Sequence, residues 1–159
     1  MMIKAIDTYY NQHLFRSRLE ARWAVYFDAL GVKWEYESEG YDLGNGMRYL
    51  PDFYLPQLDY YVEIKPCPEK RNDFERWERF AGLIKKPLVV HYGLPNALTT
   101  PLIKGIGDVI AVVPLYNVIC PEHGIFFICG GNYGADKGWQ DEFKDHIIKA
   151  KTARFENFK

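Results

Sequence analysis

The chain has 159 residues, of which 48% are apolar and 26% are charged, and its formal net charge is −1 at neutral pH. This composition is typical of one globular domain and excludes a disordered tail. The near-zero charge also excludes a protein that binds nucleic acid or an anionic membrane through its total charge alone. The three cysteines are an odd number, which disfavours a disulfide framework.

Two segments bear on membranes and secretion. The N-terminal stretch MMIKAIDTYYNQH lacks the apolar run of a signal peptide. The longest apolar stretch, VIAVVPLYNVIC, is too short to span a bilayer and contains a proline. We therefore expect a cytoplasmic protein with no membrane partner.

The first predicted elements are a helix and three strand segments. Residues 17–31 read as a helix, because apolar side chains recur at helical spacing and Gly31 supplies a stop. The recurring residues are Leu19, Trp23, Tyr26 or Phe27, and Leu30. Residues 32–38 read as a strand, and residues 40–55 read as a hairpin in which Asn45-Gly46 fits a tight turn. The next strand covers residues 58–66.

A second helix and further strands follow. Residues 69–86 are amphipathic, with one apolar face made by Phe74, Trp77, Phe80 or Ala81, and Ile84. Residues 87–93 (PLVVHYG) are continuously apolar, as in a strand buried within a sheet. The pattern then predicts strands over residues 109–113, 117–120 and 125–129, a glycine-rich loop over 130–138 and a last helix over 141–155.

These elements predict the fold class. We expect an α/β (α+β) protein with a central mixed sheet flanked by helices, in the order α-β-β-β-α-β, followed by a C-terminal hairpin and helix. No repeat or long linker divides the sequence, so we expect a single domain over residues 1–159.

Charged residues occupy strand positions where apolar residues are usual. Alternation along a strand puts Glu63 and Lys65 on one face and Val62 and Ile64 on the other, toward the helices. Asp52 lies eleven residues before Glu63, with a turn predicted over residues 56–59, so a hairpin can place the two carboxylates side by side. Two carboxylates held that close repel each other, and a divalent cation between them relieves the repulsion. The alternative is a solvated edge strand, for which an alternating acid and lysine is also common.

The segment P-D-(x10)-E-I-K, formed by Pro51, Asp52, Glu63, Ile64 and Lys65, resembles the signature of the PD-(D/E)xK nuclease superfamily. The resemblance covers residues 15–92, and the segment 16–65 is similar to small phage or bacterial endonucleases. These include phage Holliday-junction endonucleases and the end-cleaving subunit of certain transposons. The resemblance implies a restriction-endonuclease-like core, with residues 93–159 as a C-terminal extension that matches no element of the family.

The resemblance also implies roles for the site residues. Asp52 and Glu63 would bind Mg²⁺, which Mn²⁺ would replace, with help from the Ile64 carbonyl, and Lys65 would orient the attacking water. Members of the superfamily often supply a further acid from the first helix, and Glu20 is the candidate. Ser17 and Glu20 also fit a capping box, in which Glu20 would bond back to the Ser17 backbone. The two roles for Glu20 are compatible.

The predicted function is a Mg²⁺-dependent endonuclease that hydrolyses DNA phosphodiester bonds, acting on branched or replicating DNA in a phage or mobile-element setting. The alternative is a catalytically silent DNA-binding or assembly protein on a nuclease scaffold. The intact signature favours the enzyme. A homodimer is compatible with symmetrical cutting of two strands, although no heptad pattern indicates one.

Two weaker predictions concern basic residues and zinc. Candidate DNA contacts are Arg16, Arg18 and Arg22 on the first helix and Lys149, Lys151 and Arg154 on the last, although exposed helical arginines are usually only solvated. Zinc ligation by Cys120, His123 and Cys129, with His146 as a distant fourth ligand, is disfavoured because structural zinc sites usually have two close ligand pairs. Free thiols on a hairpin are the preferred interpretation.

Overall fold

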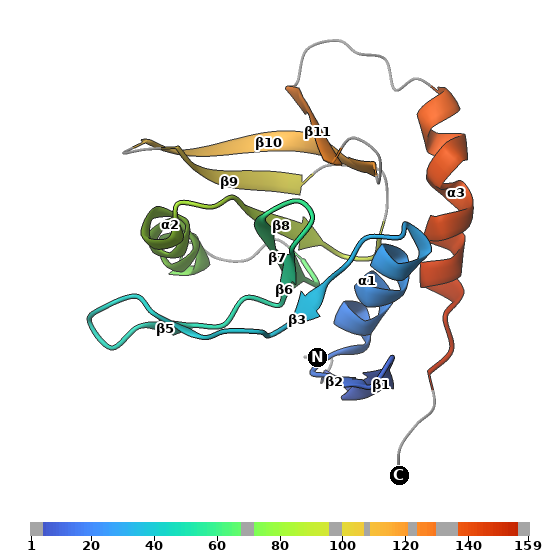
Figure 1. The fold of residues 1–159 in the computed structure, drawn as a ribbon, viewed down its shortest axis with the longest axis horizontal. Coiled ribbons are helices and arrows are strands. Elements are labelled where there is room, and N and C mark those ends of the chain that lie inside the picture. Colours follow the sequence, from blue (N-terminus) through green and yellow to red (C-terminus); the bar gives the residue numbers. More distant parts are fainter. Residues whose placement is uncertain are drawn as a thin grey trace.

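The computed structural model describes the backbone of residues 5–67, 72–95, 100–106, 109–120, 124–129 and 137–155, and the side chains of residues 5–67, 73–95 and 145–155. These ranges contain three helices and a mixed seven-stranded sheet, which confirms the expected mixture of helices and sheet. The helices are α1 (Arg18–Ala29), α2 (Asn72–Ile84) and α3 (Lys137–Thr152). Figure 1 shows α1 and α2 on opposite sides of the central strands, with α3 beside α1.

The main sheet has the strand order β11-β10-β9-β8-β7-β6-β3. Its strands are β3 (Glu35–Tyr36), β6 (Phe53–Leu55), β7 (Tyr60–Lys65), β8 (Leu88–Tyr92), β9 (Thr100–Ile106), β10 (Val109–Cys120) and β11 (Gly124–Cys129). Among the strands in the described ranges, β7 and β8 alone pair in parallel. They can do so because the chain between them crosses over through α2, whereas only a few residues of sequence separate the antiparallel pairs β6–β7, β9–β10 and β10–β11. Within this sheet and its helices, the chain order α1, β3, β6, β7, α2, β8 is the predicted one.

Two small two-stranded sheets lie outside the main sheet. One pairs β1 (Thr8–Tyr10) with β2 (His13–Phe15), and the other pairs β4 (Tyr41–Asp42) with β5 (Arg48–Tyr49). The predicted turn between β4 and β5 is confirmed: Asn45 and Gly46 have φ angles of 53° and 75°, and the Met47 N–H donates to the Gly44 carbonyl at 2.9 Å. Both central residues are left-handed, which is the type I′ geometry that Asn-Gly favours.

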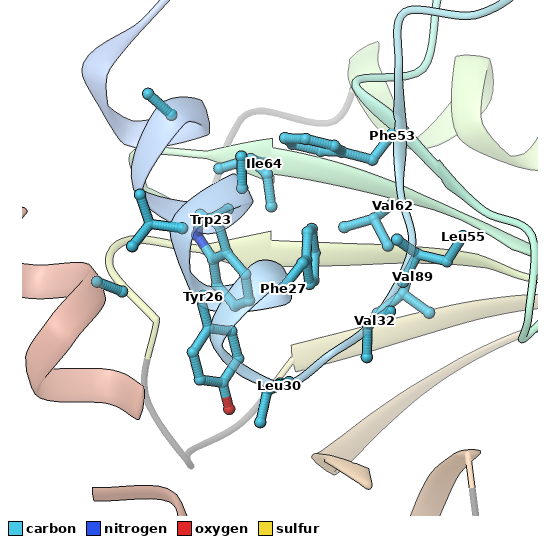
Figure 2. Packing of buried hydrophobic residues seen from close by; sticks show 14 of the residues in the cluster. Trp23, Tyr26, Phe27, Leu30, Val32, Phe53, Leu55, Val62, Ile64 and Val89 are labelled. Carbon is cyan, nitrogen blue, oxygen red and sulfur yellow. The ribbon is translucent and has the colours of Figure 1, made fainter. Parts of the chain in front are cut away.

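Helix α1 covers one face of the sheet. The Ser17 hydroxyl caps its N-terminus by accepting from the Glu20 N–H at 3.2 Å. Trp23 and Phe27 of the helix pack into a cluster with Val62 and Ile64 of β7 (Figure 2). Each of these side chains is at most 4% exposed, so this cluster forms the larger part of the described core.

Helix α2 covers the other face. Trp77, Phe80 and Ala81 are buried against a second cluster that contains Tyr49 and Tyr61. The predicted apolar face of α2 is thereby confirmed. Val62 and Ile64 face α1, as predicted. Helix α2 packs on the opposite side of β7, with Tyr61, where the sequence pattern had not placed a helix.

The C-terminal half differs most from the prediction. Strand β9 was not predicted, and β10 is one continuous strand where two were expected. Pro114 does not interrupt β10: it pairs with Pro101 of β9 and lies one residue outside the β10–β11 register, where its missing N–H breaks no bond to β11. Helix α3 begins at Lys137 and ends at Thr152, not at residues 141 and 155.

Candidate active site

The register of β6 and β7 places Asp52 beside Glu63. Phe53 pairs with Val62, so one further step along the same register sets Asp52 opposite Glu63 at the end of β6. Both side chains are buried, with Asp52 5% and Glu63 4% exposed. The backbone N–H of Ile64 donates to Asp52 Oδ2 at 2.7 Å, which fixes this carboxylate against β7. The predicted juxtaposition of the two acids is therefore present, whatever their role.

Glu63 is held by two further side chains. The Tyr49 hydroxyl donates to Glu63 Oε2 at 2.7 Å, and this hydrogen bond is buried. Lys65 Nζ lies 2.8 Å from Glu63 Oε1, as expected for residues two apart on one face of a strand. Glu63 is therefore paired on both oxygens before any ligand arrives.

Glu20 reaches the same region from the first turn of α1. Its Oε1 accepts from the Ser17 hydroxyl at 2.6 Å, and its Oε2 accepts from the Tyr36 hydroxyl at 2.5 Å. The capping-box prediction is confirmed in its first half, the bond from the Glu20 N–H to the Ser17 side chain. The return contact of Glu20 is to the Ser17 hydroxyl, whereas we had expected the Ser17 backbone.

These residues line one cavity of about 430 Å³. The cavity contains all five residues that the sequence singled out, namely Glu20, Asp52, Glu63, Ile64 and Lys65. Its other lining residues are Ala5, Arg16, Arg48, Tyr49, Leu50 and Arg76. A larger hollow of about 510 Å³ beside Asp28 and Trp34 contains none of the five.

The acids in the cavity influence one another electrostatically. Burial raises the pKa of Asp52 well above its ordinary value, and the negative charges of Glu63 and Glu20 raise it further. The Ile64 N–H and the Lys65 ammonium lower this pKa, and the raising effects are the larger. Burial, then the Glu63 charge, also raises the pKa of Tyr49 well above its ordinary value, so this hydroxyl stays a hydrogen-bond donor at neutral pH.

The donor chemistry of the cavity suits a hard divalent cation. Carboxylate oxygens and a backbone carbonyl are the ligands that Mg²⁺ and Mn²⁺ prefer. Burial is the main cause of the raised pKa of Asp52, and a cation would offset the second cause, the negative charges of Glu63 and Glu20. Within the described residues, however, no three His, Cys, Asp or Glu side chains are already arranged to hold a metal ion. Glu20 and Glu63 would each have to exchange a partner within the protein for the ion.

The residues predicted to contact DNA fall into different settings. Arg16 lines the cavity, forms an ion pair with Glu37 and lies 3.7 Å from Asp52 Oδ1. Arg22 donates to the Lys151 carbonyl at 2.7 Å and so ties α1 to the end of α3, a structural role that the sequence did not predict. Arg18 is half-buried, and the remaining three, Lys149, Lys151 and Arg154, are exposed on or just after α3.

Sequence reasoning missed several residues of the cavity, chiefly Arg48, Tyr49 and Arg76. Arg48 and Tyr49 precede Asp52 by four and three residues, so their place in the hairpin just before the signature was the available signal. For Arg76, the sequence signal was limited to its position on the polar side of α2. The role of Tyr36 as a donor to Glu20 had no sequence signal, because it depends on how α1 crosses β3.

The hairpin of β10 and β11 separates two of the candidate zinc ligands. Cys120 pairs with Gly124 and Cys129 pairs with Leu115, so the two cysteines lie five residues apart along β10. At about 3.3 Å per residue this is roughly 17 Å between Cα atoms, far more than one tetrahedral zinc with Zn–S bonds of about 2.3 Å can bridge. His123 lies outside the described residues.

No helix in the described part of the chain is long and apolar enough to cross a membrane. Comparisons with protein-family models, with curated proteins and with solved structures found no match for this chain.

Proposed function

We propose that the protein is a Mg²⁺-dependent endonuclease that hydrolyses DNA phosphodiester bonds, built on a restriction-endonuclease-like core. The observation that carries this proposal is the pairing of two buried acids, Asp52 and Glu63, with Lys65 in one cavity at the end of the central strand β7. A buried carboxylate whose pKa is raised by burial and by neighbouring acids, as that of Asp52 is, is typical of functional sites when it lines a cavity.

The order of the elements supports the same proposal. Asp52 immediately precedes β6 and Glu63 lies on β7, both between α1 and α2 in the chain, and β8 follows in parallel beside β7. This is the α-β-β-β-α-β order that the sequence signature implies. The extra strands β9, β10 and β11 extend the sheet from β8, away from the cavity-lining strands.

Each residue has a defined task in this proposal. Asp52 and Glu63, with Glu20 and the Ile64 carbonyl, would hold the ion, which when bound acidifies water and withdraws charge from the scissile phosphate. The Ile64 N–H keeps Asp52 oriented toward the cavity. Lys65, now 2.8 Å from Glu63, can donate to the attacking water or to a phosphate oxygen.

The test is cleavage of supercoiled, linear and four-way-junction DNA with Mg²⁺ or with EDTA. We expect cleavage with Mg²⁺, none with EDTA, and a loss of at least about 100-fold in Asp52→Asn, Glu63→Gln and Lys65→Ala. The matched controls are Glu75→Gln on the exposed side of α2 and Lys33→Ala, which lie outside the cavity. Cleavage that persists in all three site variants would refute the proposal.

A second function is favoured by one observation. The oxygens of Glu20 and Glu63 are already paired with protein donors, and the described residues contain no ready-made metal group. A catalytically silent DNA-binding protein would keep this arrangement unchanged. It predicts duplex binding without cleavage, and binding that is unaffected by Glu63→Gln. Homodimerisation stays a prediction from the sequence under either function.

A further inference from the structure

Three arginines from separate parts of the chain line the cavity together with its acids. Arg16 precedes α1, Arg48 lies on β5 and Arg76 lies on α2, and all three line the same cavity as Asp52 and Glu63. Their charged groups reach solvent: the side chains of Arg16 and Arg76 are 58% and 44% exposed, and Arg48 is also exposed. The cavity is therefore acidic inside and cationic at its rim.

Two of these arginines are weakly engaged within the protein. The Arg48 guanidinium makes no hydrogen bond or ion pair with the described residues. Arg76 has one distant ion pair, 3.9 Å from Asp73 Oδ1. Arg16, in contrast, is already paired with Glu37 and lies near Asp52. Of the three arginines at the rim, Arg48 and Arg76 therefore have N–H groups that can donate hydrogen bonds to a ligand.

The packing of β5 and α2 holds these two side chains near the acids. Tyr49, the neighbour of Arg48, donates to Glu63 and packs with Trp77 and Phe80. These two aromatic residues follow Arg76 on α2 by one and four positions. The Arg76 charge also lowers the pKa of Tyr49, against the larger raising effect of burial, so Arg76 acts within range of the Tyr49–Glu63 pair. Figure 1 shows β5 on an arm that extends on the same side as α2.

An acidic interior with an arginine rim selects a particular ligand. The three acids repel an anion from the floor of the cavity unless a cation covers them, whereas a guanidinium at the rim offers paired N–H donors that match phosphate oxygens. A ligand that interacts with both the acidic floor and the arginine rim must carry several phosphates spaced along a chain. One phosphate would lie over the acids and the neighbouring phosphates would lie at the rim.

We propose that Arg48 and Arg76 form a phosphate clamp that binds the DNA backbone on the side of the cavity formed by β5 and α2. This proposal rests on the proposed function, since it assigns the phosphate contacts of the same substrate. It commits to a phosphodiester backbone and makes no claim on base sequence, because phosphate contacts position a duplex without reading it.

The experiment measures binding of a fluorescent DNA duplex by anisotropy, using the full chain with Asp52→Asn so that cleavage cannot interfere. Salt is varied between about 50 and 200 mM, because each lost phosphate contact lowers the salt dependence of the affinity by a slope of about 0.9. We expect Arg48→Ala and Arg76→Ala each to weaken binding at least about fivefold and to lower the slope by about one.

Arg79→Ala is the matched control, because Arg79 lies one turn after Arg76 on α2, is paired with Glu75 and does not line the cavity. It should leave the slope unchanged. Equal losses in Arg79→Ala and Arg76→Ala, binding within about twofold of the parent in both clamp variants, or a parent that binds no duplex would overturn the clamp.

The experiments distinguish a failure of the clamp proposal from a failure of the proposed nuclease function. If the wild-type chain does not cleave DNA but Arg48→Ala and Arg76→Ala lower the salt slope, the clamp stands and the nuclease assignment falls. If the wild type cleaves but both variants bind like the parent, the nuclease assignment stands and the clamp falls.

Discussion

The backbone N–H of Ile64 donates a 2.7 Å hydrogen bond to Oδ2 of Asp52, across the gap between β7 and the end of β6. This bond holds a buried carboxylate beside Glu63, even though the two negative charges repel. If Asp52 were in an exposed surface turn, water would solvate its carboxylate and the charge would not lower the stability of the fold. The fold instead keeps the acid buried, and the resulting cost in stability can be measured.

Asp52→Asn should stabilise the protein at neutral pH in the absence of metal. The folded-state pKa of Asp52 lies above its ordinary value of 3.8, so above about pH 4 the folded chain keeps a proton that the unfolded chain releases. The free energy of unfolding of the wild type therefore falls as pH rises through this window, until the folded-state pKa is passed. Asparagine keeps an oxygen for the Ile64 N–H but cannot ionise. We expect its melting temperature to exceed that of the wild type by at least about 2 °C at pH 7.

Thermal unfolding in EDTA between about pH 4 and pH 8 checks this sign. The gap between Asp52→Asn and the wild type should close toward the acidic end, and the control Glu75→Gln should follow the wild type throughout. Mn²⁺ should raise the melting temperature of the wild type more as pH rises, because the ion needs the ionised carboxylate. A gap that is constant across pH would show that Asp52 titrates normally.

Tyr49→Phe should destabilise the protein, whereas Tyr60→Phe should not. Tyr49 donates a buried hydrogen bond to Glu63, and its loss should cost about 1–3 kcal/mol because the acceptor is a charged group. The Tyr60 hydroxyl is buried and meets no hydrogen-bond partner among the described residues, so its removal should be neutral or stabilise by up to about 1 kcal/mol.

Urea unfolding of both variants gives the comparison, and Mn²⁺ affinity gives a second readout. Tyr49→Phe should weaken Mn²⁺ binding about tenfold or more, because Tyr49 orients a proposed ligand, while Tyr60→Phe should not change it. Equal destabilisation by the two substitutions would mean that both act through packing alone.

The central part of the fold could be predicted because its signals are local. The helical spacing of Trp23 and Phe27, the turn at Asn45-Gly46 and the apolar run before Tyr92 each depend on neighbours in the sequence. The parallel pairing of β7 with β8 follows once α2 is recognised as the crossover. Strand β9 had no such signal, and the continuity of β10 through Pro114 depends on the register of three strands, which no single segment encodes.

The acids of the site could be predicted for the same reason, but their partners could not. Asp52, Glu63 and Lys65 belong to one hairpin, so alternation and loop length place them. The contacts Tyr49–Glu63, Tyr36–Glu20 and Arg22–Lys151 join residues up to 129 positions apart. Such pairs depend on how the separate strands and helices lie against one another, which local patterns do not specify.

Glu20→Gln and Ser17→Ala should separate the two roles of Glu20. If Glu20 helps to hold the ion, glutamine keeps an oxygen for the Ser17 and Tyr36 hydroxyls but loses the charge. Cleavage should then fall at least about tenfold, with stability changed by less than about 1 kcal/mol. Ser17→Ala removes the helix cap and should cost about 1 kcal/mol, with little change in cleavage.

The two measurements are melting temperature and the rate of DNA cleavage in Mg²⁺. We expect Glu20→Gln to lose cleavage activity while keeping its stability, and Ser17→Ala to lose stability while keeping its activity. Should Glu20→Gln lose stability and keep its activity, Glu20 would be a capping residue only.

Arg22→Ala should weaken the attachment of α3 without affecting DNA binding. The Arg22 guanidinium donates to the Lys151 carbonyl in the last turn of α3, where the unpaired carbonyls of a helix end favour a cation. Its loss should destabilise the protein by about 1 kcal/mol, whereas Lys149→Ala, at an exposed position on the same helix, should change stability by less than about 0.5 kcal/mol. The salt slope of duplex binding should stay at the wild-type value in Arg22→Ala, because this guanidinium is held by α3. A slope lowered by about 0.9 with unchanged stability would instead restore Arg22 to the DNA contacts that the sequence predicted.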